Sequence, residues 1–343
     1  MIDPKDMAHC REAIRTGSYS FHAASRLLPG RIRDPSLALY AFCRLADDAV
    51  DEHDDKAAAV LRLRERLDCV YAGRPQNTPA DRAFAAIVEE FEMPMALPDA
   101  LLEGLAWDAQ GREYRSLSDL RSYCARVAAA VGVMMCVLMR VRDADALARA
   151  ADLGVAMQLT NIVRDIGEDA RARRMYLPLD WLAHAGLRKE DIWRNPRPHP
   201  ALAAIAGQLL GEARALYEQS EAGIAALPFA ARPGIFAARY AYAGIGDVVA
   251  RNGYDSVTQR AVTRRHQKLG WLALSVLRSM SVTVMPQSAV LHRKPLPETA
   301  FLVAAAAHRG AQPSWADQRS AELLAVLAQL EQTDRDKRVA RLA

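Results

Sequence analysis

The sequence predicts an all-α protein with a sizeable hydrophobic core. Hydrophobic residues make up 51% of the 343 residues, while aromatic residues make up only 6%. Alanine and leucine dominate, and β-branched runs are scarce, which favours helices over strands. Apolar residues recur with helical spacing from end to end, and no segment shows the convincing alternation that is typical of a strand.

Loop segments rich in proline and glycine separate roughly ten predicted helices. In chain order these segments are residues 29–35, 73–79, 94–98, 195–200 and 232–234. None of them resembles an interdomain linker. We therefore expect one all-α domain over residues 1–295 and a helical tail over residues 296–343. Within that tail, residues 314–332 are expected to form a separate short helix.

The longest uncharged apolar run, residues 127–139, is closed by Arg126 and Arg140. It is too short to span a bilayer and is predicted to be a core helix. Its glycine and alanine residues serve either close helix packing or the wall of an apolar cavity, and the sequence leaves both alternatives open.

Charge and cysteine usage limit the class of protein. The net charge is +4, and arginines are interleaved with acidic residues throughout. No basic stripe for nucleic acid is present, although anionic substrates or a membrane surface would fit. Asp3, Lys5 and Asp6 argue against a secretory signal. An odd number of cysteines in apolar surroundings indicates reduced thiols and a cytosolic protein. These cysteines are Cys10, Cys43, Cys69, Cys124 and Cys136.

Two predicted helices, over a hundred residues apart, each carry acidic residues along one face. A helix turns once every 3.6 residues, so residues three or four apart form a stripe. The first stripe comprises Tyr40, Arg44, Asp47 and Asp51. The second stripe comprises Gln158, Asn161, Asp165 and Asp169.

The two stripes point to a metal site. Stacked carboxylates repel each other by roughly 3 kcal/mol per pair at about 5 Å and an effective dielectric of about 20. Apolar neighbours indicate that both helices are buried, so the stripes should line one interior cavity and face each other. Divalent cations that bridge to a diphosphate would neutralise them. A single D-x-x-x-D pattern is usually a solvated face, but the second stripe argues against that here.

Several other chemistries lack their motifs. The sequence has no G-x-G-x-x-G after a strand, no P-loop and no H-E-x-x-H. Its serines lack a nucleophile elbow. His22, His53 and His266 are isolated, and we expect each to be structural or solvated.

These residues make the chain resemble the squalene and phytoene synthase family of head-to-head prenyl transferases, most of all its bacterial phytoene synthases. The resemblance covers most of residues 10–290. It is carried by residues 17–21 (GSYSF), 40–51, 123–132 and 153–178. Two positions depart from the family pattern: Tyr19 stands where a lysine is common, and Gly244 where a larger residue often follows Tyr242.

The resemblance implies an isoprenoid synthase-type helical bundle around a central cavity, and it assigns roles to the stripes. Asp47, Asp51, Asp165 and Asp169 would be catalytic, and together with Asn161 they would hold two or three Mg²⁺ or Mn²⁺ ions. The residues expected to bind the substrate are Ser20, Tyr40, Arg44, Gln158, Arg164, Arg174, Tyr242 and Lys268. Lys268 belongs to a basic cluster with Arg264 and Arg265 that either serves this site or is a solvated helix face.

The implied reaction condenses two geranylgeranyl diphosphates, through prephytoene diphosphate, to phytoene in carotenoid biosynthesis. No NADPH is expected, and a nucleotide requirement is not indicated either way. One alternative is a C30 relative that uses farnesyl diphosphate and makes presqualene diphosphate, dehydrosqualene or squalene; pocket depth would decide between them. Another is a non-catalytic homologue, but such proteins typically lose an aspartate, and all four are kept here.

Lipid substrates and a lipid product predict a cytoplasmic protein that associates peripherally with the inner membrane, where contacts with other carotenoid enzymes would also fit. Residues 269–285 are rich in apolar side chains and follow the basic cluster Arg264, Arg265 and Lys268. This segment is either a membrane contact or the last helix packed in the core.

Overall fold

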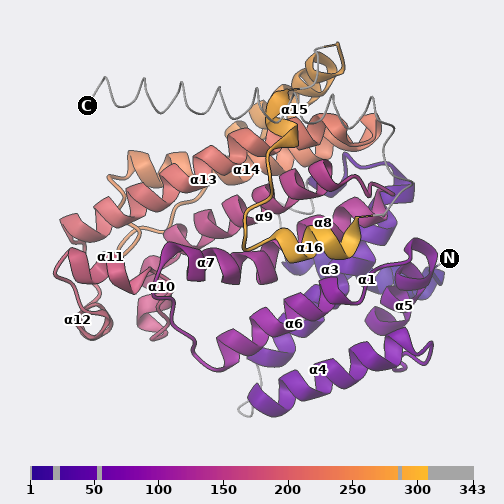
Figure 1. Ribbon diagram of the computed structural model, residues 1–343, viewed down its shortest axis with the longest axis horizontal. Helices are drawn as coiled ribbons and strands as arrows, with labels where there is room; N and C mark the ends of the chain where they lie inside the picture. The colour runs from indigo at the N-terminus through magenta and orange to yellow at the C-terminus, as the bar shows by residue number, and fades with distance from the viewer. Residues whose placement is uncertain (1, 18–23, 52–55, 285–287, 308–343) are drawn as a thin grey trace.

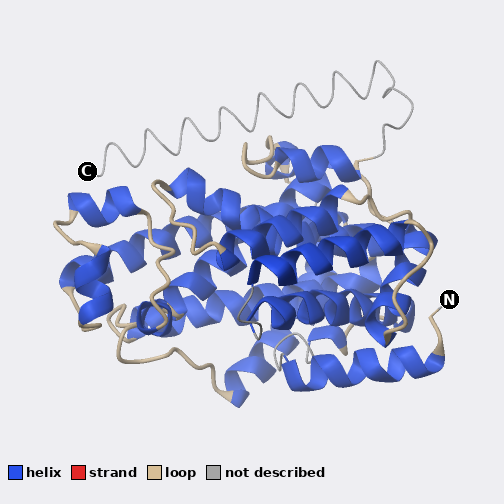
Figure 2. Cartoon of the chain, turned by 90° about the horizontal axis from the view of Figure 1, so that it is seen from below, coloured by secondary structure: helices blue, strands red, loops and turns tan. Residues whose placement is uncertain are grey.

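The computed structural model describes residues 2–17, 24–51, 56–284 and 288–307. Throughout this part of the chain the regular elements are helices, and no strand occurs, which confirms the all-α prediction (Figures 1 and 2). The helices lie side by side in a bundle, with α4 at one edge and α15 at the opposite edge (Figure 1).

The helices vary widely in length. The first half contains α1 (Pro4–Gly17), α3 (Gly30–Asp51), α4 (Lys56–Tyr71), α5 (Pro79–Phe91), α6 (Ala96–Ala109), α7 (Leu117–Cys124), the π-helical turn η1 (Ala125–Ala129), α8 (Ala130–Leu138) and α9 (Ala144–Arg164). The second half contains α10 (Ile166–Arg171), α11 (Leu179–His184), α12 (Lys189–Arg194), α13 (Pro200–Ala226), the 3₁₀ turn η2 (Phe229–Ala231), α14 (Arg232–Arg251), α15 (Arg265–Val284), the 3₁₀ turn η3 (Ala289–His292) and α16 (Ala300–Ala306).

The loops predicted at residues 73–79 and 195–200 lie between helices, and the loop predicted at residues 94–98 does so in part, because α6 begins at Ala96. The loop expected at residues 232–234 is wrong, because α14 begins at Arg232 and a proline fits the first turn of a helix.

The boundary before α5 shows the cause of such a loop at its cap. The Thr78 side chain accepts a hydrogen bond from the Asp81 amide, and Pro79 opens α5. The loop expected at residues 29–35 is wrong, because α3 begins at Gly30 and includes Pro35. Proline removes a hydrogen bond to the carbonyl group four residues earlier. That carbonyl belongs to Arg31, an exposed residue in the first turn of the helix.

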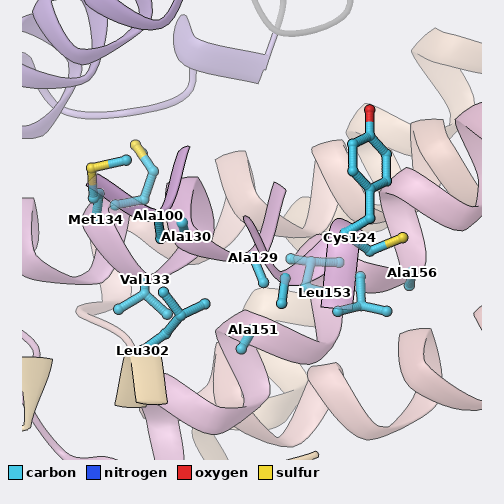
Figure 3. Packing of buried hydrophobic residues seen from close by; sticks show 14 of the residues in the cluster. Ala100, Cys124, Ala129, Ala130, Val133, Met134, Ala151, Leu153, Ala156 and Leu302 are labelled. Carbon is cyan, nitrogen blue, oxygen red and sulfur yellow. The ribbon is translucent and has the colours of Figure 1, made fainter. Parts of the chain in front are cut away.

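Helix α9 is the centre of the bundle. It packs against α13, α14, α8, η1 and α16. A Cβ atom at Gly154 of α9 would lie 2.5 Å from the Cα atom of Ala129, so the absence of a side chain lets α9 and η1 touch backbone to backbone. Figure 3 shows this contact region, where small side chains such as Ala129, Ala130, Ala151 and Ala156 fill the space between the helices.

The predicted core helix at residues 127–139 is confirmed as part of a longer helical stretch. Met134, Val137 and Leu138 are buried in the bundle. Within the described residues, Leu117–Leu138 is the one stretch whose length and composition would suffice to cross a membrane, and most of it is buried inside the protein.

The packed bundle continues beyond residue 295, where the sequence analysis placed the end of the domain. Leu302, Val303 and Ala306 of α16 are buried, and α16 packs against α9, α6 and α8. The helix expected at residues 314–332 lies outside the described residues.

We predict that Gly154→Ala destabilises the protein by about 1–3 kcal/mol, because the new methyl group would overlap backbone atoms that cannot move aside easily. Urea denaturation followed by circular dichroism measures the effect. Gly211→Ala in α13 is the control, because nothing lies within 4 Å of a Cβ atom there. Its higher helix propensity should leave stability unchanged or raise it by up to about 1 kcal/mol. Equal stability losses in both variants would contradict the packing argument.

Candidate active site

A cavity of about 320 Å³ lies inside the bundle between α3, η1, α8, α9, α13 and α14. Its walls are mainly apolar. Of the two alternatives that the sequence left open for residues 127–139, close packing and a cavity wall, the segment serves both: a Cβ atom at Gly132 would lie 2.8 Å from the Ala150 carbonyl oxygen, and seven residues line the cavity. These are Val127, Ala128, Val131, Gly132, Met135, Cys136 and Met139. The π-helical turn η1 belongs to this wall, a position where such turns often accompany functional sites.

One end of the cavity is polar, and the rest of its wall is mainly apolar. Helix α9 lines it from Ala146 to Asn161. At a rise of 1.5 Å per residue, this part of α9 spans about 22 Å. Gln158 and Asn161 mark the polar end, where Tyr40 of α3 and Tyr242 of α14 join them in the lining. The structure therefore brings Tyr40 of the first stripe, and Gln158 and Asn161 of the second stripe, to the same cavity.

Asn161 presents a buried oxygen atom at this polar end. Its side-chain nitrogen donates a hydrogen bond of 3.4 Å to Gln158, but its Oδ1 atom has no hydrogen-bond partner within the described structure. A buried acceptor without a donor is costly in an apolar setting. Such an oxygen is well suited to a cation, because divalent metals prefer oxygen ligands.

The carboxylates of the stripes are paired with arginines. Arg44 lies 3.7 Å from Asp47 and 2.6 Å from Asp48. Asp165 accepts hydrogen bonds from Arg164 and, at 2.9 Å, from Arg260. The repulsion expected within the stripes is therefore reduced before any cation binds. Guanidinium groups supply much of the positive charge that the sequence analysis assigned to metal ions alone.

The two aspartates of α9 and α10 differ sharply in their electrostatics. Burial acts to raise the pKa of Asp165, but the hydrogen bonds from Arg164 and Arg260 outweigh it and leave that pKa below its usual range. Burial, reinforced by the negative charge of Asp165, raises the pKa of Asp169 to about 7, although Arg174 acts in the opposite direction. Near neutral pH, Asp169 is thus held close to the point at which it gains or loses a proton.

Asp108, near the end of α6, is a site residue that the sequence analysis missed. Its carboxylate accepts hydrogen bonds of 2.8 Å from the hydroxyl groups of Tyr123 and Tyr176. Burial raises the pKa of Asp108, and the charge of Asp47 acts in the same direction; Asp108 in turn helps raise the pKa of Asp169. The only signal in the sequence was an aspartate within an otherwise apolar stretch of α6.

Arg260 was also missed, because the sequence analysis considered the basic cluster a few residues further on. Lys268 of that cluster lies on α15 and does not line the cavity, and Arg264 is exposed. The Arg265 side chain lies outside the described residues. The loop that follows α14 instead delivers Arg260 to Asp165 and, at 3.3 Å, to Glu168.

The remaining candidates are only partly visible. Arg174 follows α10, and its charge acts on both Asp169 and Asp108. Asp51 ends α3, but its side chain lies outside the described residues. Ser20 and Tyr19 lie outside them entirely, as do His22 and His53, while His266 is exposed on α15. Gly244 departs from the family pattern for a steric reason: a Cβ atom there would lie 2.1 Å from the ring of Trp271.

The donor set fits divalent cations, although its present arrangement is not a finished metal site. Within the described residues, no group of three histidine, cysteine, aspartate or glutamate side chains is arranged to hold an ion. Asp47 and Asp165 are turned to arginines, as described above. Two groups are best suited to take a cation. The Oδ1 atom of Asn161 has no hydrogen-bond donor within the described structure, and the carboxylate of Asp169 has a pKa that is raised by burial and then by the charge of Asp165.

The fold and the site together define an all-helical synthase with an apolar cavity and an end rich in aspartate and arginine. Residues 14–267 match the family model described as squalene/phytoene synthase, and the chain belongs to that family. A phytoene synthase of Cereibacter sphaeroides is 62% identical over 98% of this chain and 96% of that protein. One of Rhodobacter capsulatus is 56% identical over 98% of each. Among solved structures, a dehydrosqualene synthase in complex with ligand has a TM-score of 0.74 at 31% identity, covering 81% of this chain and 97% of that one.

We predict that Asp169→Asn stabilises the metal-free protein at pH 8 by roughly 1–3 kcal/mol. The folded pKa of about 7 exceeds the unfolded value, so the folded state binds the extra proton between about pH 4 and pH 7. The wild-type free energy of unfolding should therefore fall as pH rises through this window, whereas the variant lacks this penalty. Urea denaturation in the presence of EDTA at pH 5 and pH 8 tests it.

Asp165→Asn is the matched control, with the opposite sign. Its folded pKa is lowered, so the charged form contributes stability above the unfolded pKa and loses it as pH falls through the folded pKa. This variant should be less stable than the wild type at pH 8. If both variants shift stability in the same direction, the contrast between the two aspartates is not real.

We also predict that Asp108→Asn lowers turnover by about tenfold or more while the fold persists. Hydrogen bonds to a charged group contribute about 1.5–3 kcal/mol, and the amide cannot accept from both tyrosines as a carboxylate does. Steady-state kinetics and thermal melting measure the two effects. Tyr123→Phe and Tyr176→Phe each remove one of the two hydrogen bonds. Wild-type kinetics in Asp108→Asn would remove it from the site.

Proposed function

We propose that this protein is a prenyltransferase of the phytoene synthase type, which condenses two geranylgeranyl diphosphates head to head and releases diphosphate. The observation that carries the proposal is the cavity, which α9 lines over about 22 Å. Its polar end, where Tyr40 and Tyr242 lie, is close to the arginine–aspartate pairs of α3 and α9. Such a cavity matches the chemistry of a prenyl diphosphate, with its long hydrocarbon tail and charged head. The two phytoene synthases at 62% and 56% identity support the same reaction.

Arginines at the polar end are suited to hold the diphosphate. A guanidinium group is always charged, and its planar fork matches phosphate oxygens. Arg44 and Arg164 are now paired with Asp47 and Asp165, and Arg174 lies near Asp169. We propose that these pairs exchange partners when substrate binds: each arginine turns to phosphate oxygens, and each carboxylate becomes free to bind a cation.

The residues that would hold divalent cations are Asp47, Asp51, Asn161, Asp165 and Asp169. When bound, Mg²⁺ or Mn²⁺ supplies the positive charge that makes diphosphate a competent leaving group. The residues of the chain position that diphosphate and keep the leaving group in place at the polar end. Tyr40 and Tyr242 line the same end and would contact the head of the substrate.

The apolar wall provides the second requirement of this chemistry. In the first step, one substrate loses diphosphate and its allylic cation alkylates the 2,3 double bond of the other; proton loss closes the cyclopropane ring of prephytoene diphosphate. In the second step, that compound loses its diphosphate, rearranges and loses a proton to give phytoene, so no reductant is consumed. An allylic cation survives only where water is excluded. Val131, Met135 and Leu153 supply such a surface along the cavity.

The length of the cavity also bears on the C30 alternative. Five extra carbons per chain are worth up to about 4 kcal/mol of burial, so depth sets the preference. The part of α9 that lines the cavity is long enough to accompany an extended C20 chain. The two phytoene synthases at 62% and 56% identity also favour the C40 reaction over the C30 alternative.

Product analysis tests the reaction. Purified protein with Mg²⁺ or Mn²⁺ is incubated with geranylgeranyl or farnesyl diphosphate, with and without NADPH, and the extracted hydrocarbon is identified. We expect phytoene from geranylgeranyl diphosphate, with no dependence on NADPH. A C30 hydrocarbon as the preferred product would overturn the C40 assignment.

Asp47→Ala and Asp165→Ala are expected to lower turnover by at least about a thousandfold, since each removes a proposed cation ligand. Leu61→Ala, an exposed position on α4, is the matched control and should keep wild-type turnover. Circular dichroism checks that the variants fold. Wild-type turnover in either aspartate variant would rule out its assigned role.

We further propose that the protein works at the cytoplasmic face of the inner membrane as a peripheral protein. Its product is a hydrocarbon with no favourable route into water, and a bilayer is the natural acceptor. The residues that would make this contact are considered next.

A further inference from the structure

We propose that the outer face of α15 is a lipid-binding surface through which the protein contacts an anionic bilayer. This inference rests on the proposed function, because a lipid substrate and a lipid product require contact with a bilayer. The sequence left two alternatives for this helix, a core position or a membrane contact. The structure places α15 at the outer edge of the bundle, opposite α4 (Figure 1).

The outer face of α15 is apolar and exposed. Large apolar side chains recur there at helical spacing and form one stripe along the described helix. They are Leu269, Val276, Leu277, Met280 and Val284, with exposed fractions of 66%, 44%, 65%, 59% and 87%. Single exposed apolar residues are common on soluble proteins, but a contiguous set on one helix face marks an interaction site.

The inner face of the same helix explains why the outer face is left bare. Ser275 and Ser279 are buried and donate hydrogen bonds to carbonyl groups of their own helix. Trp271 stacks closely over Gly244 of α14, where no side chain intervenes. Small and polar residues, together with the inward-facing Trp271, thus anchor α15 to α14, while Leu277, Met280 and Val284 point away from the bundle. A helix packed in a core would bury these three residues.

The charge around the face selects an anionic lipid surface as its occupant. Helix α15 contains no aspartate or glutamate. Arg264, just before the helix, is exposed, and Lys268 lies in its first turn. Basic residues beside an apolar helix face favour the headgroups of an anionic bilayer. A second protein copy would gain nothing from this charge.

The far end of the helix extends the same surface. Arg232 donates a hydrogen bond of 2.9 Å to Thr283 of α15 and lies over the ring of Phe229. Phe229, in the turn before α14, is 54% exposed. An exposed aromatic residue beside an arginine suits the boundary between headgroups and acyl chains.

The surface is one helix away from the cavity. Helix α15 packs on α14, and Ile235, Ala238 and Tyr242 of α14 line the cavity. A bilayer bound at α15 would therefore lie close to the wall behind which the hydrocarbon chains are held. This position gives the apolar face of α15 a use that matches the chemistry inside the bundle.

The experiment compares two charge substitutions at equally exposed leucines. The test variant is Leu277→Glu on α15, and the matched control is Leu61→Glu on α4 at the opposite edge; both leucines are 65% exposed. Full-length proteins are floated with vesicles containing an anionic phospholipid or only a neutral one, at low salt. We expect the wild type and the control to float with anionic vesicles. The affinity of the test variant for these vesicles should be lower by about tenfold or more.

Activity in detergent micelles separates this inference from the proposed function. All three proteins should turn over geranylgeranyl diphosphate equally there, because none of the substituted residues lines the cavity. If the wild type has no activity in micelles, the proposed function is contradicted. The flotation result does not depend on activity and tests the lipid-binding surface alone. Wild-type protein that stays in the lipid-free fraction, or a test variant that floats as well as the control, overturns the lipid surface.

A photo-crosslinking amino acid at position 277 identifies the occupant directly. We expect crosslinks to lipid in the presence of vesicles. A crosslink to a second copy of the chain, or to residues 308–343 of the same chain, with lipid crosslinks absent, would overturn the proposal and assign the face to that partner instead.

Discussion

The pairing of arginine with aspartate at one end of an apolar cavity is the constraint on which this structure depends. Carboxylates placed inside a helical bundle are costly unless they are paired and hydrogen-bonded. Arg164 and Arg260 serve Asp165, whose side chain is 18% exposed. Arg44 serves Asp47 and Asp48 at the rim, where their side chains are 51% and 36% exposed. These pairs let α3 and α9 hold acidic residues close to the polar end of the same cavity without a bound ligand.

The same cavity depends on close packing elsewhere in the bundle. A space of about 320 Å³ forgoes contacts that a filled core would make. Helix α9 compensates through direct backbone contact with η1 at Gly154 and through extensive packing against α13. Gly154 also lines the cavity, so the same small residue both tightens the bundle and leaves space beside α9.

The sequence predicted the parts of this arrangement that are local. Helical spacing was enough to place the two stripes on their helices and to predict the core helix at residues 127–139, because each depends on residues a few positions apart. The Arg44–Asp48 pair was open to the same reasoning, since its members are four residues apart, yet the argument from repulsion overlooked it. Pro35 was misjudged because a proline near the exposed start of a helix costs less than one in its interior.

Other parts depend on tertiary contacts that no spacing reveals. Asp108 meets Tyr123 and Tyr176, and Arg260 meets Asp165, only because distant helices and loops converge. The sequence contained no sign that α15 would turn its larger residues outward, since core and surface alternatives share the same apolar composition. Gly244 was visible as a departure from the family pattern, but its reason, the ring of Trp271, appeared only in the structure.

The balance of charge at the polar end also explains why arginines alone would not suffice for a diphosphate. Carboxylates of Asp47, Asp48, Asp108, Asp165 and Asp169 outnumber the guanidinium groups of Arg44, Arg164, Arg174 and Arg260 among the described residues. Burial, and after it the charge of Asp165, raises the pKa of Asp169 to about 7, so charged carboxylates and guanidinium groups are nearly balanced at this end near neutral pH. A diphosphate that entered alone would bring negative charge that the paired arginines do not offset. Under the proposed function, entry of the substrate with cations would compensate that charge, favour release of the Asp169 proton and free the arginines for phosphate oxygens. The balance of charge therefore favours a diphosphate that arrives together with cations.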